Sequence, residues 1–383
     1  MAFTDELATG VVPSGAPELL AAFSLTPARA AGWTLFAFGA LAVALEAPLL
    51  ATAHGRRERL LRTAGLALMG LAMCGAALAP SYGFLLAALA LYGPASGLGT
   101  NLAEAALVAA SPRRREAVLA RWSLLGLVGD LLAPAALAVS VAAGAGWRGA
   151  LLASGVLAAA QAALSLRAPV ASGASSDSDP PSSGSPRRAL RAALSCPRLV
   201  TWSAAAVPCA LMDEVLVAFG AIWLASHLEA DPSTRAAILV AGTVGALAGA
   251  AILERVAGRV RASTLLAVSG LGCAAAYVAW LAATSWVASA VALAFVGLFA
   301  SAHYPLVRAR AFAAMPDGPN VVLATGSAMG ALELAVPLVV GVTADAVGIG
   351  AAMLLLLAQP LSVTAAAAVA RREESLERPE RQR

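Results

Sequence analysis

A pair of acidic residues recurs at matching positions in the two halves of this chain, inside stretches apolar enough to cross a lipid bilayer. Asp5-Glu6 returns as Asp213-Glu214, 208 residues later. The run Gly-Ala-Leu-Ala at residues 39–42 returns at 245–248, 206 residues later. Because these offsets are about half of the 383 residues, the sequence predicts two homologous halves.

A third correspondence joins an acid to a nearby proline in each half. Asp130 lies four residues before Pro134, and Glu333 lies four residues before Pro337. An ionisable group in the hydrocarbon core costs several kcal/mol, so an acid retained there is by default a functional hypothesis. Two homologous membrane halves with polar positions near the midplane are typical of a secondary transporter.

The composition excludes a soluble fold. The chain is 60% hydrophobic and only 13% charged, and its mean hydropathy is +0.79. A spanning helix needs about 20 apolar residues, and lipid cannot satisfy exposed backbone groups, so all spans should be helices. No charged leader with a cleavage site precedes the first span, which we therefore expect to be retained. The prediction is an all-α polytopic membrane protein with twelve spans, at 3–23, 30–53, 61–80, 83–110, 118–143, 147–167, 199–227, 236–257, 263–283, 286–312, 320–344 and 347–370.

The basic residues, all arginine, predict the orientation. Twenty-one of the 26 follow even-numbered spans or lie in the tail, and only three fall between the other spans: Arg29, Arg148 and Arg235. By the positive-inside rule, both termini face the cytoplasm. The pI of about 9.2 therefore reflects topology and does not indicate a nucleic-acid partner.

A stretch rich in Ser, Gly and Pro separates the two halves. Residues 168–186 cannot bury a core and are typical of a flexible linker. We expect a six-helix bundle at 1–167, a cytoplasmic linker at 168–198, a second bundle at 199–370 and a cytoplasmic tail at 371–383. The four cysteines lack disulfide or metal spacing, so neither a metal nor a cofactor is expected.

Two loops resemble the signature of the major facilitator superfamily, which has the form G-x-x-x-D-R-x-G-R-R. The loop after the second span has Gly55-Arg56-Arg57 in place, but Pro48 and Thr52 replace its first Gly and its Asp. The loop after the eighth span keeps Glu254-Arg255, and Gly258-Arg259 follows one position late. The resemblance covers nearly the whole chain and implies two pseudo-symmetric six-helix bundles.

Three weaker motifs support the same resemblance. Pro17-Glu18-Leu19 closes the first span and Trp147-Arg148-Gly149 opens the sixth, as often in the family. Gly126, Gly129 and Pro134 loosely resemble the glycine-rich fifth helix of family exporters. The simpler interpretation of these glycines, which we favour, is that they permit close helix packing.

In the family, the Asp and Arg of the signature loop tie the two halves together on the cytoplasmic side. Thr52 cannot supply that charge. The resemblance implies that Glu254, with Arg255 and Arg259, either carries such a latch alone or has lost it. Arg56 and Arg57 then do no more than set the topology.

Depth in the membrane separates the acids that matter for function. Asp130 lies about ten residues into the fifth span, roughly 15 Å at 1.5 Å per residue, which is close to the midplane. Glu333 and the pair Asp213-Glu214 lie at a similar depth. The repeat places Asp5-Glu6 there as well. These six acids are the expected proton-coupling residues.

A second set of polar residues lies toward the ends of the fourth and tenth spans. Glu104 and Arg308 both lie eight residues before a proline, at matching positions of the repeat, and are expected to form an ion pair. That pair either serves transport or simply fastens the halves. Arg310 is expected near the cytoplasmic mouth. His303 and Tyr304 are expected either to line the cavity or to pack in the bundle.

The sign of these charges constrains the cargo. Near mid-depth, seven acids face two arginines, so the cavity should repel anions. A carboxyl group in such surroundings can carry a proton in one state and release it in another. The sequence predicts a proton-coupled transporter, a monomer in the cell membrane, that exports a small amphipathic neutral or cationic compound. An uptake carrier for a small polar solute remains the alternative within that class.

Two alternatives belong to other classes: a membrane-embedded enzyme and a non-transporting sensor. Against an enzyme, the three histidines are scattered and no metal spacing or Ser-His-Asp arrangement occurs. Against a sensor, no soluble output domain is attached.

Only four residues precede Asp5, whereas about fourteen helical residues precede Asp213. We therefore expect the natural start to lie upstream of Met1.

Overall fold

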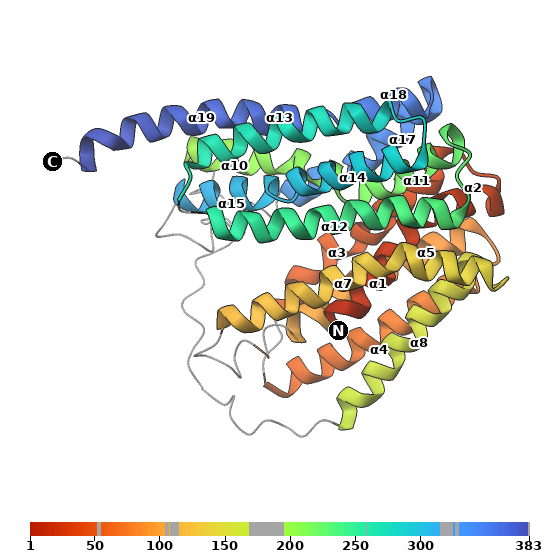
Figure 1. Cartoon of the computed structure of the whole chain (residues 1–383). Coiled ribbons are helices and arrows are strands. Elements are labelled where there is room, and N and C mark those ends of the chain that lie inside the picture. Colours follow the sequence, from red (N-terminus) through yellow and green to blue (C-terminus); the bar gives the residue numbers. More distant parts are fainter. Residues whose placement is uncertain are drawn as a thin grey trace. The chain divides into compact units, whose positions relative to one another are not determined.

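The computed structural model describes residues 1–51, 55–103, 107, 115–167, 195–257, 259–314, 325 and 329–381. These residues are almost entirely helical (Figure 1). Within the described ranges no strand forms, and the pairing of Ala257 with Val260 is a single isolated bridge. The all-α membrane fold predicted from composition is therefore confirmed.

The chain separates into two compact units. The first consists of Met1–Pro181 together with the short segments Asp231–Ala236 and Pro337–Ala346. The second consists of Ser182–Ala230, Ala237–Val336 and Val347–Arg383.

The N-terminal helices, up to residue 167, belong to the first unit. Their bounds are α1 (Ala2–Ser14), α2 (Ala16–Phe23), the π-helical η1 (Ala28–Trp33), α3 (Thr34–Ala51), α4 (Gly55–Ala77), α5 (Tyr82–Ser96), the π-helical η2 (Gly97–Asn101), α7 (Arg115–Ala142) and α8 (Gly146–Arg167).

The helices of the second half follow from residue 197. Their bounds are α10 (Pro197–Ala206), the 3₁₀-helical η3 (Val207–Met212), α11 (Glu214–His227), α12 (Pro232–Val256), α13 (Ala262–Leu281), α14 (Trp286–Ala300), α15 (His303–Ala314), α17 (Val336–Val347), α18 (Ile349–Leu355) and α19 (Ala358–Arg381).

Eleven described segments are long and apolar enough to cross a membrane. The first predicted span is not among them because Gly15 divides it into α1 and α2, each short. Four predicted spans are likewise interrupted: 199–227 by η3, 286–312 at residues 301–302, 320–344 at residues 334–335, and 347–370 at residues 356–357. The last helix also continues to Arg381, through most of the expected tail.

The core of the first unit is built by α4, α5 and α8. Leu66, Met73 and Leu89 are completely buried there. Small residues let α4 approach α8 closely: a Cβ built on Gly70 would lie only 2.9 Å from the Ala159 nitrogen. Close backbone approach at small residues is how membrane helices gain packing energy, because lipid offers no hydrophobic driving force between them.

The second unit has its own apolar core, shared by α10, α13, α15 and α19. Leu199, Trp202, Leu266, Val307 and Val363 are at most 1% exposed. In Figure 1, α13 and α19 run side by side, in agreement with their extensive packing.

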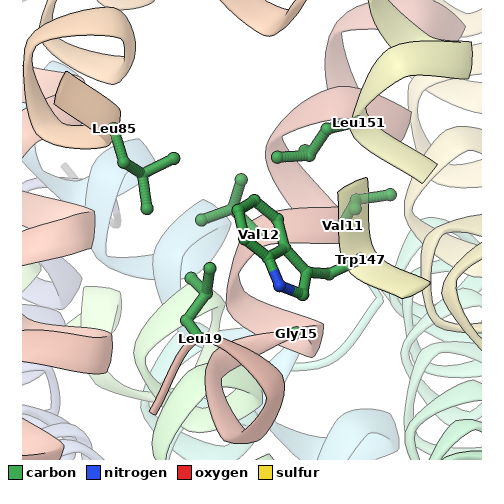
Figure 2. A pocket seen from close by; sticks show the side chains of 7 residues that line it. All are labelled: Val11, Val12, Gly15, Leu19, Leu85, Trp147 and Leu151. Atoms are coloured by element: carbon green, nitrogen blue, oxygen red, sulfur yellow. The ribbon is translucent and has the colours of Figure 1, made fainter. Parts of the chain in front are cut away.

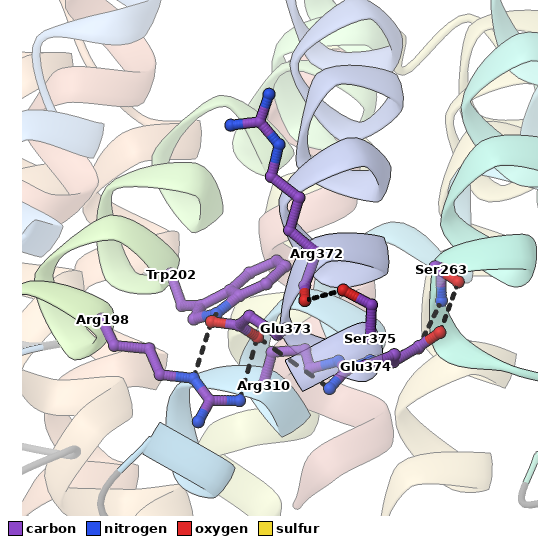
Figure 3. A network of polar contacts seen from close by, with 8 residues as sticks. All are labelled: Arg198, Trp202, Ser263, Arg310, Arg372, Glu373, Glu374 and Ser375. Carbon is purple, nitrogen blue, oxygen red and sulfur yellow. Dashed lines mark hydrogen bonds and ion pairs between the residues drawn. The ribbon is translucent and has the colours of Figure 1, made fainter. Parts of the chain in front are cut away.

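A network of charged residues fastens one end of this core, and we call it the α19 network (Figure 3). Arg198 of α10 binds Glu373 with both forks of its guanidinium, at 2.6 and 3.0 Å, and the Trp202 indole donates to the same carboxylate at 3.2 Å. Arg310 of α15 pairs with the adjacent Glu374. The network therefore ties α10 and α15 to α19.

Candidate functional site

Asp5 of α1 is held by two hydroxyl groups from α5. The Tyr92 hydroxyl donates to Asp5 Oδ1 at 2.8 Å, and the Ser96 hydroxyl donates to the same oxygen at 2.6 Å. Hydroxyl groups can donate or accept, so they can satisfy both a charged carboxylate and a protonated carboxyl group. Asp5 can therefore gain or lose a proton without leaving an unsatisfied neighbour. We call Asp5, Tyr92 and Ser96 the Asp5 cluster.

The backbone changes its helical type directly after this cluster. The α-helix α5 ends at Ser96 and the π-helical η2 begins at Gly97. Single π turns inside helices are frequent at functional sites. A further polar contact lies one residue before Asp5, where Gln161 of α8 donates to the buried Thr4 hydroxyl at 2.6 Å. Polar side chains from α1, α5 and α8 thus converge on the beginning of α1.

Glu6 and Asp130 lie where α1 packs against α7. A Cβ built on Gly126 would lie 3.2 Å from Glu6 Cγ, and one built on Gly10 would lie 3.7 Å from Asp130 Oδ1. A Cβ on Gly129 would meet the Phe3 carbonyl oxygen at 2.5 Å. The glycines of α7 therefore permit close packing, as predicted, and they place both acids at this helix interface.

Asp213 and Glu214 lie at a complete break in the seventh span. The 3₁₀ turn η3 ends at Met212, Asp213 has φ −125° and ψ −129°, and α11 begins at Glu214. Both acids are exposed. Broken helices in membrane transporters leave backbone groups and side chains available to ligands, and a carboxylate at a helix N-terminus is stabilised by the helix dipole.

The break is tethered by Gln359 of α19. The Gln359 Oε1 atom accepts the Met212 backbone N–H at 2.7 Å, and its Nε2 lies 3.1 Å from His303 Nδ1. Gln359 is 2% exposed and His303 is completely buried. His303 thus packs inside the second unit and is linked, through one side chain, to the residue before Asp213.

Arg308 and Glu333 lie close enough for their charges to interact. The guanidinium of Arg308 also bonds the Tyr304 hydroxyl and lies 5.3 Å from the centre of that ring. Glu333 ends its helical stretch, and Pro337 has no N–H to offer the Glu333 carbonyl, so the helix restarts at α17. Tyr304, by contrast with His303, is 44% exposed.

The remaining predicted site residues divide into two groups. Arg310 belongs to the α19 network, where Glu373 and Glu374 balance its charge. Among the latch residues, Glu254, Arg255 and Arg259 are exposed. Arg57 is exposed on α4, which begins at Gly55-Arg56. Two predicted site residues, Glu104 and Gly258, lie outside the described residues, so the Glu104–Arg308 pair stays a prediction.

Glu18 of α2 has a partner within the first unit. It forms an ion pair with Arg235, one of the three arginines that fall between the other spans. Both side chains are largely buried, at 15% and 8% exposed. Nearby in sequence, the Ala28 N–H donates to Asp345 at 2.9 Å. Both acids therefore have a polar partner inside the first unit.

A small cavity in the first unit is unsuited to a substrate (Figure 2). Its volume is about 10 Å³, enough for roughly one water molecule. The side chains that line it are apolar: Val11, Val12, Gly15, Leu19, Leu85, Trp147 and Leu151. Within the described residues no group of His, Cys, Asp and Glu has the arrangement of a metal site.

The sequence comparison decides the family. A family model described as Major Facilitator Superfamily matches residues 1–331. The chain belongs to the Major Facilitator Superfamily. It is a multi-pass membrane transporter and not an enzyme. A comparison with proteins of curated function finds no match.

Solved structures of the superfamily share the fold. A bacterial homologue of the human lysosomal transporter Spinster, inward-facing and unoccupied, is 18% identical with a TM-score of 0.66, over 96% of this chain and 93% of that chain. The nucleoside transporter NupG is 12% identical with a TM-score of 0.75, over 96% of both chains. At these identities the likeness concerns the fold alone.

Four polar residues of this site were not predicted: Tyr92, Ser96, Gln161 and Gln359. They are uncharged, and the prediction considered mainly charged residues at repeated positions. A signal for two of them was present, because a glutamine inside an apolar span needs a hydrogen-bonding partner in the bundle. Their particular partners depend on how the helices pack and could not be predicted.

Proposed function

We propose that this superfamily transporter couples the movement of protons to the export of a small amphipathic compound, neutral or cationic. The observation that carries the proposal is the Asp5 cluster, in which a carboxylate inside the first unit is bonded by hydroxyl groups that tolerate either protonation state. A site of this kind can bind and release a proton during a transport cycle.

The acid pair at the break in the seventh span supports the same proposal from the second unit. Asp213 and Glu214 are exposed at a point where the helix is interrupted, and acids at such positions attract cations and protons. Asp130 and Glu333, each four residues before a proline, are further proton-coupling residues in this proposal. The surplus of acids favours neutral or cationic cargo over anions.

The wider organisation is part of the proposal. Two six-helix bundles, at 1–167 and 199–370, work as a monomer in the cell membrane, joined by a cytoplasmic linker at 168–198. Both termini face the cytoplasm in this proposal, which the arginine distribution supports. Glu254, Arg255 and Arg259 act as a latch on that side.

Reconstituted vesicles with an imposed pH gradient test the proposal. The compounds are a panel of amphipathic amines and their neutral analogues. We expect at least one compound to move against its concentration gradient while protons move in the opposite direction. A pH-sensitive dye inside the vesicles measures the proton movement. Asp5→Asn should abolish gradient-driven transport and preserve energy-independent exchange, because Asn still bonds Tyr92 and Ser96. Asp130→Asn should behave similarly.

The matched control is Glu229→Gln, which neutralises an exposed acid in a short connection and should leave transport unchanged. Full gradient-driven transport by Asp5→Asn would contradict a coupling role for Asp5. If no compound moves protons in the wild-type protein, proton coupling itself is wrong. Accumulation of small polar solutes in the uptake direction would favour the alternative carrier.

A further inference from the structure

The amide of Gln359 can have only one orientation. The backbone N–H of Met212 is a donor, so the Gln359 atom 2.7 Å from it must be the oxygen. The amide nitrogen then faces His303 Nδ1, at 3.1 Å. Because the NH₂ group can only donate, His303 Nδ1 must accept, and the imidazole carries its proton on Nε2.

Burial favours a neutral ring at His303, because an apolar interior disfavours the charged imidazolium ion. The Ser269 main chain of α13 lies beside the imidazole, although Nε2 makes no hydrogen bond of good geometry within the described residues. Both His303 and Gln359 are buried, so water cannot replace a lost partner. The three groups, His303, Gln359 and the Met212 N–H, therefore form one chain of hydrogen bonds with a fixed direction.

Protonation of His303 reverses that direction. An imidazolium ion has N–H donors at both nitrogens, so Nδ1–H would face the Gln359 NH₂ group, donor against donor. Rotating the amide would satisfy Nδ1–H with the Gln359 oxygen, but it would turn the NH₂ group toward the Met212 N–H. In either case one of the two hydrogen bonds of Gln359 is lost. If the amide rotates, the lost bond is the one to the Met212 N–H, which directly precedes Asp213 in the chain.

We propose that His303 and Gln359 form a proton-sensitive tether that holds the break before Asp213-Glu214 when His303 is neutral and releases it when His303 is protonated. Gln359 is a positioning residue here, acting on the acids through the Met212 backbone. The inference deepens the proposed function, on which it rests, because it gives the second unit a second proton-binding group.

Other titratable groups lie on the elements packed around His303. Cys273 and Tyr277 lie on α13, Cys209 on η3, and Asp213 and Glu214 just beyond it. Arg198 of α10 and Glu373 and Glu374 of α19 pair within the α19 network (Figure 3). The other charged residues of α19 follow Ala370, toward the end of that helix, and α14 has none. On α15, Arg308 interacts with Tyr304 and Glu333. Of these groups, Asp213 is the one that directly follows the tethered residue.

Hydrogen–deuterium exchange of the purified, detergent-solubilised protein tests the tether without any substrate. The readout is exchange in the peptide that contains residues 207–213, from about pH 8 to about pH 4, corrected for the intrinsic pH dependence of exchange. In the wild type, we expect the Met212 amide to be protected from exchange at pH 8. Once His303 is protonated, the corrected exchange rate of this amide should be roughly fivefold higher than the corrected rate at pH 8.

Two variants isolate the parts of the tether. His303→Asn keeps an acceptor near Nδ1 and cannot titrate, so protection should become independent of pH. Gln359→Glu places two acceptor oxygens between Met212 and the ring, so protection should persist at low pH, where the carboxylate pairs with the imidazolium ion. His227→Asn alters a histidine stacked on Trp223 in α11 and should leave the wild-type pH dependence intact.

Wild-type protection that does not change with pH, or an unchanged pH response in His303→Asn, would overturn the tether. If His303→Asn does not fold, Gln359→Glu decides: loss of protection at low pH in that variant contradicts the proposal. Transport is measured separately. A pH-sensitive tether in a protein that moves no protons would refute the proposed coupling and leave the tether standing.

Discussion

At the scale of single residues, the partners of each acid indicate whether it holds helices together or can exchange a proton during transport. Glu373 and Glu374 are bound by the guanidinium groups of Arg198 and Arg310, whose charges never change. Asp5 is bound by hydroxyl groups, which accommodate a change of charge. The first arrangement favours one protonation state permanently, and the second permits two. The presence of a charge is therefore an incomplete criterion for function.

Glu373→Gln should destabilise the second unit. The change removes the charge that Arg198 and Arg310 share, and these side chains are 36% and 12% exposed. We expect a loss of about 1–3 kcal/mol, between the values for exposed and for buried pairs, measured as a lower midpoint of thermal unfolding in detergent.

Glu58→Gln is the matched control for that prediction. It removes one member of the Glu58–Arg62 pair on α4, which lies at 4.0 Å and is 33% and 22% exposed. Its effect should stay below about 0.5 kcal/mol. Equal effects of the two variants would show that the α19 network contributes no more than a surface pair.

The sequence identified candidate charged residues but did not predict the surroundings in which the structure places them. Asp213 was predicted at mid-depth from its repeat with Asp5, and it lies at a break that nothing in the apolar pattern indicated. Arg310 was expected near the cytoplasmic mouth, and its pairing with Glu373 and Glu374 of α19 was not predicted. Repeat positions specify where a residue lies along a helix, whereas its neighbours depend on tertiary packing, which a single sequence does not give.

At the scale of helices, the α1–α7 interface depends on glycine. A Cβ on Gly129 would lie 2.5 Å from the Phe3 oxygen and 2.9 Å from the Leu7 nitrogen, so Gly129→Ala must push the backbones apart. We expect a destabilisation of about 1–3 kcal/mol. The yield of folded protein, measured by size-exclusion chromatography, should be lower than for the wild type. Because Glu6 lies at this interface, transport should fall as well.

Gly83→Ala is the control for Gly129. It also replaces a helical glycine, in α5, but a Cβ there meets nothing within 4 Å. The variant should be neutral or stabilised by about 0.5–1 kcal/mol, because alanine loses less backbone entropy than glycine on folding. A comparable loss of stability in both variants would contradict the packing explanation.

Asp231 caps the N-terminus of α12 and should make stability depend on pH. Its carboxylate accepts from the Ser233 and Thr234 backbone N–H groups at 2.8 and 3.1 Å. Hydrogen bonds from the Ser233 and Thr234 hydroxyls, together with these N–H groups, hold the pKa of Asp231 well below its usual range. Because the pKa is lower in the folded state, the ionised Asp231 stabilises the folded protein at any pH above about 3.9, the pKa of aspartate in the unfolded chain. That stability is lost as the pH falls below this value toward the folded-state pKa.

Asp231→Asn removes the titration and retains a capping side chain. The difference in unfolding temperature between wild type and variant should be constant from about pH 7 to 5 and should shrink as the pH falls below about 4. Glu229→Gln, in the same connection, should show no such change. A difference that is independent of pH would mean that the charge of Asp231 does not contribute.

Helix positions were more predictable than helix irregularities. The predicted spans 61–80, 147–167, 236–257 and 263–283 correspond to α4, α8, α12 and α13. The breaks at Gly15 and Asp213 and the π turns were not predicted, because apolar composition continues through them. A hydrophobic window detects whether a segment can lie in lipid, and it is insensitive to local backbone geometry.

At the scale of the whole molecule, the arginine distribution is the property that should decide orientation. With 21 of 26 arginines in the segments after even-numbered spans and in the tail, the charge difference is too large for a few substitutions to reverse. A fluorescent protein fused after residue 383 should therefore fold and fluoresce. A phosphatase that is active only outside the cytoplasm should be active when it is fused after residue 143 or residue 230.

The same reporters test the basis of that orientation. Replacing the four arginines between the second and third spans by glutamine leaves 17 in the basic segments, so the fusion after residue 143 should keep its activity, since the positive-inside bias is summed over several loops. If a phosphatase fused after residue 383 of the otherwise unmodified protein were active, the C-terminus would lie outside the cytoplasm and the topology would be the reverse of the one predicted. It would place the Glu254 latch and the linker outside the cell and thereby contradict the proposed cytoplasmic latch.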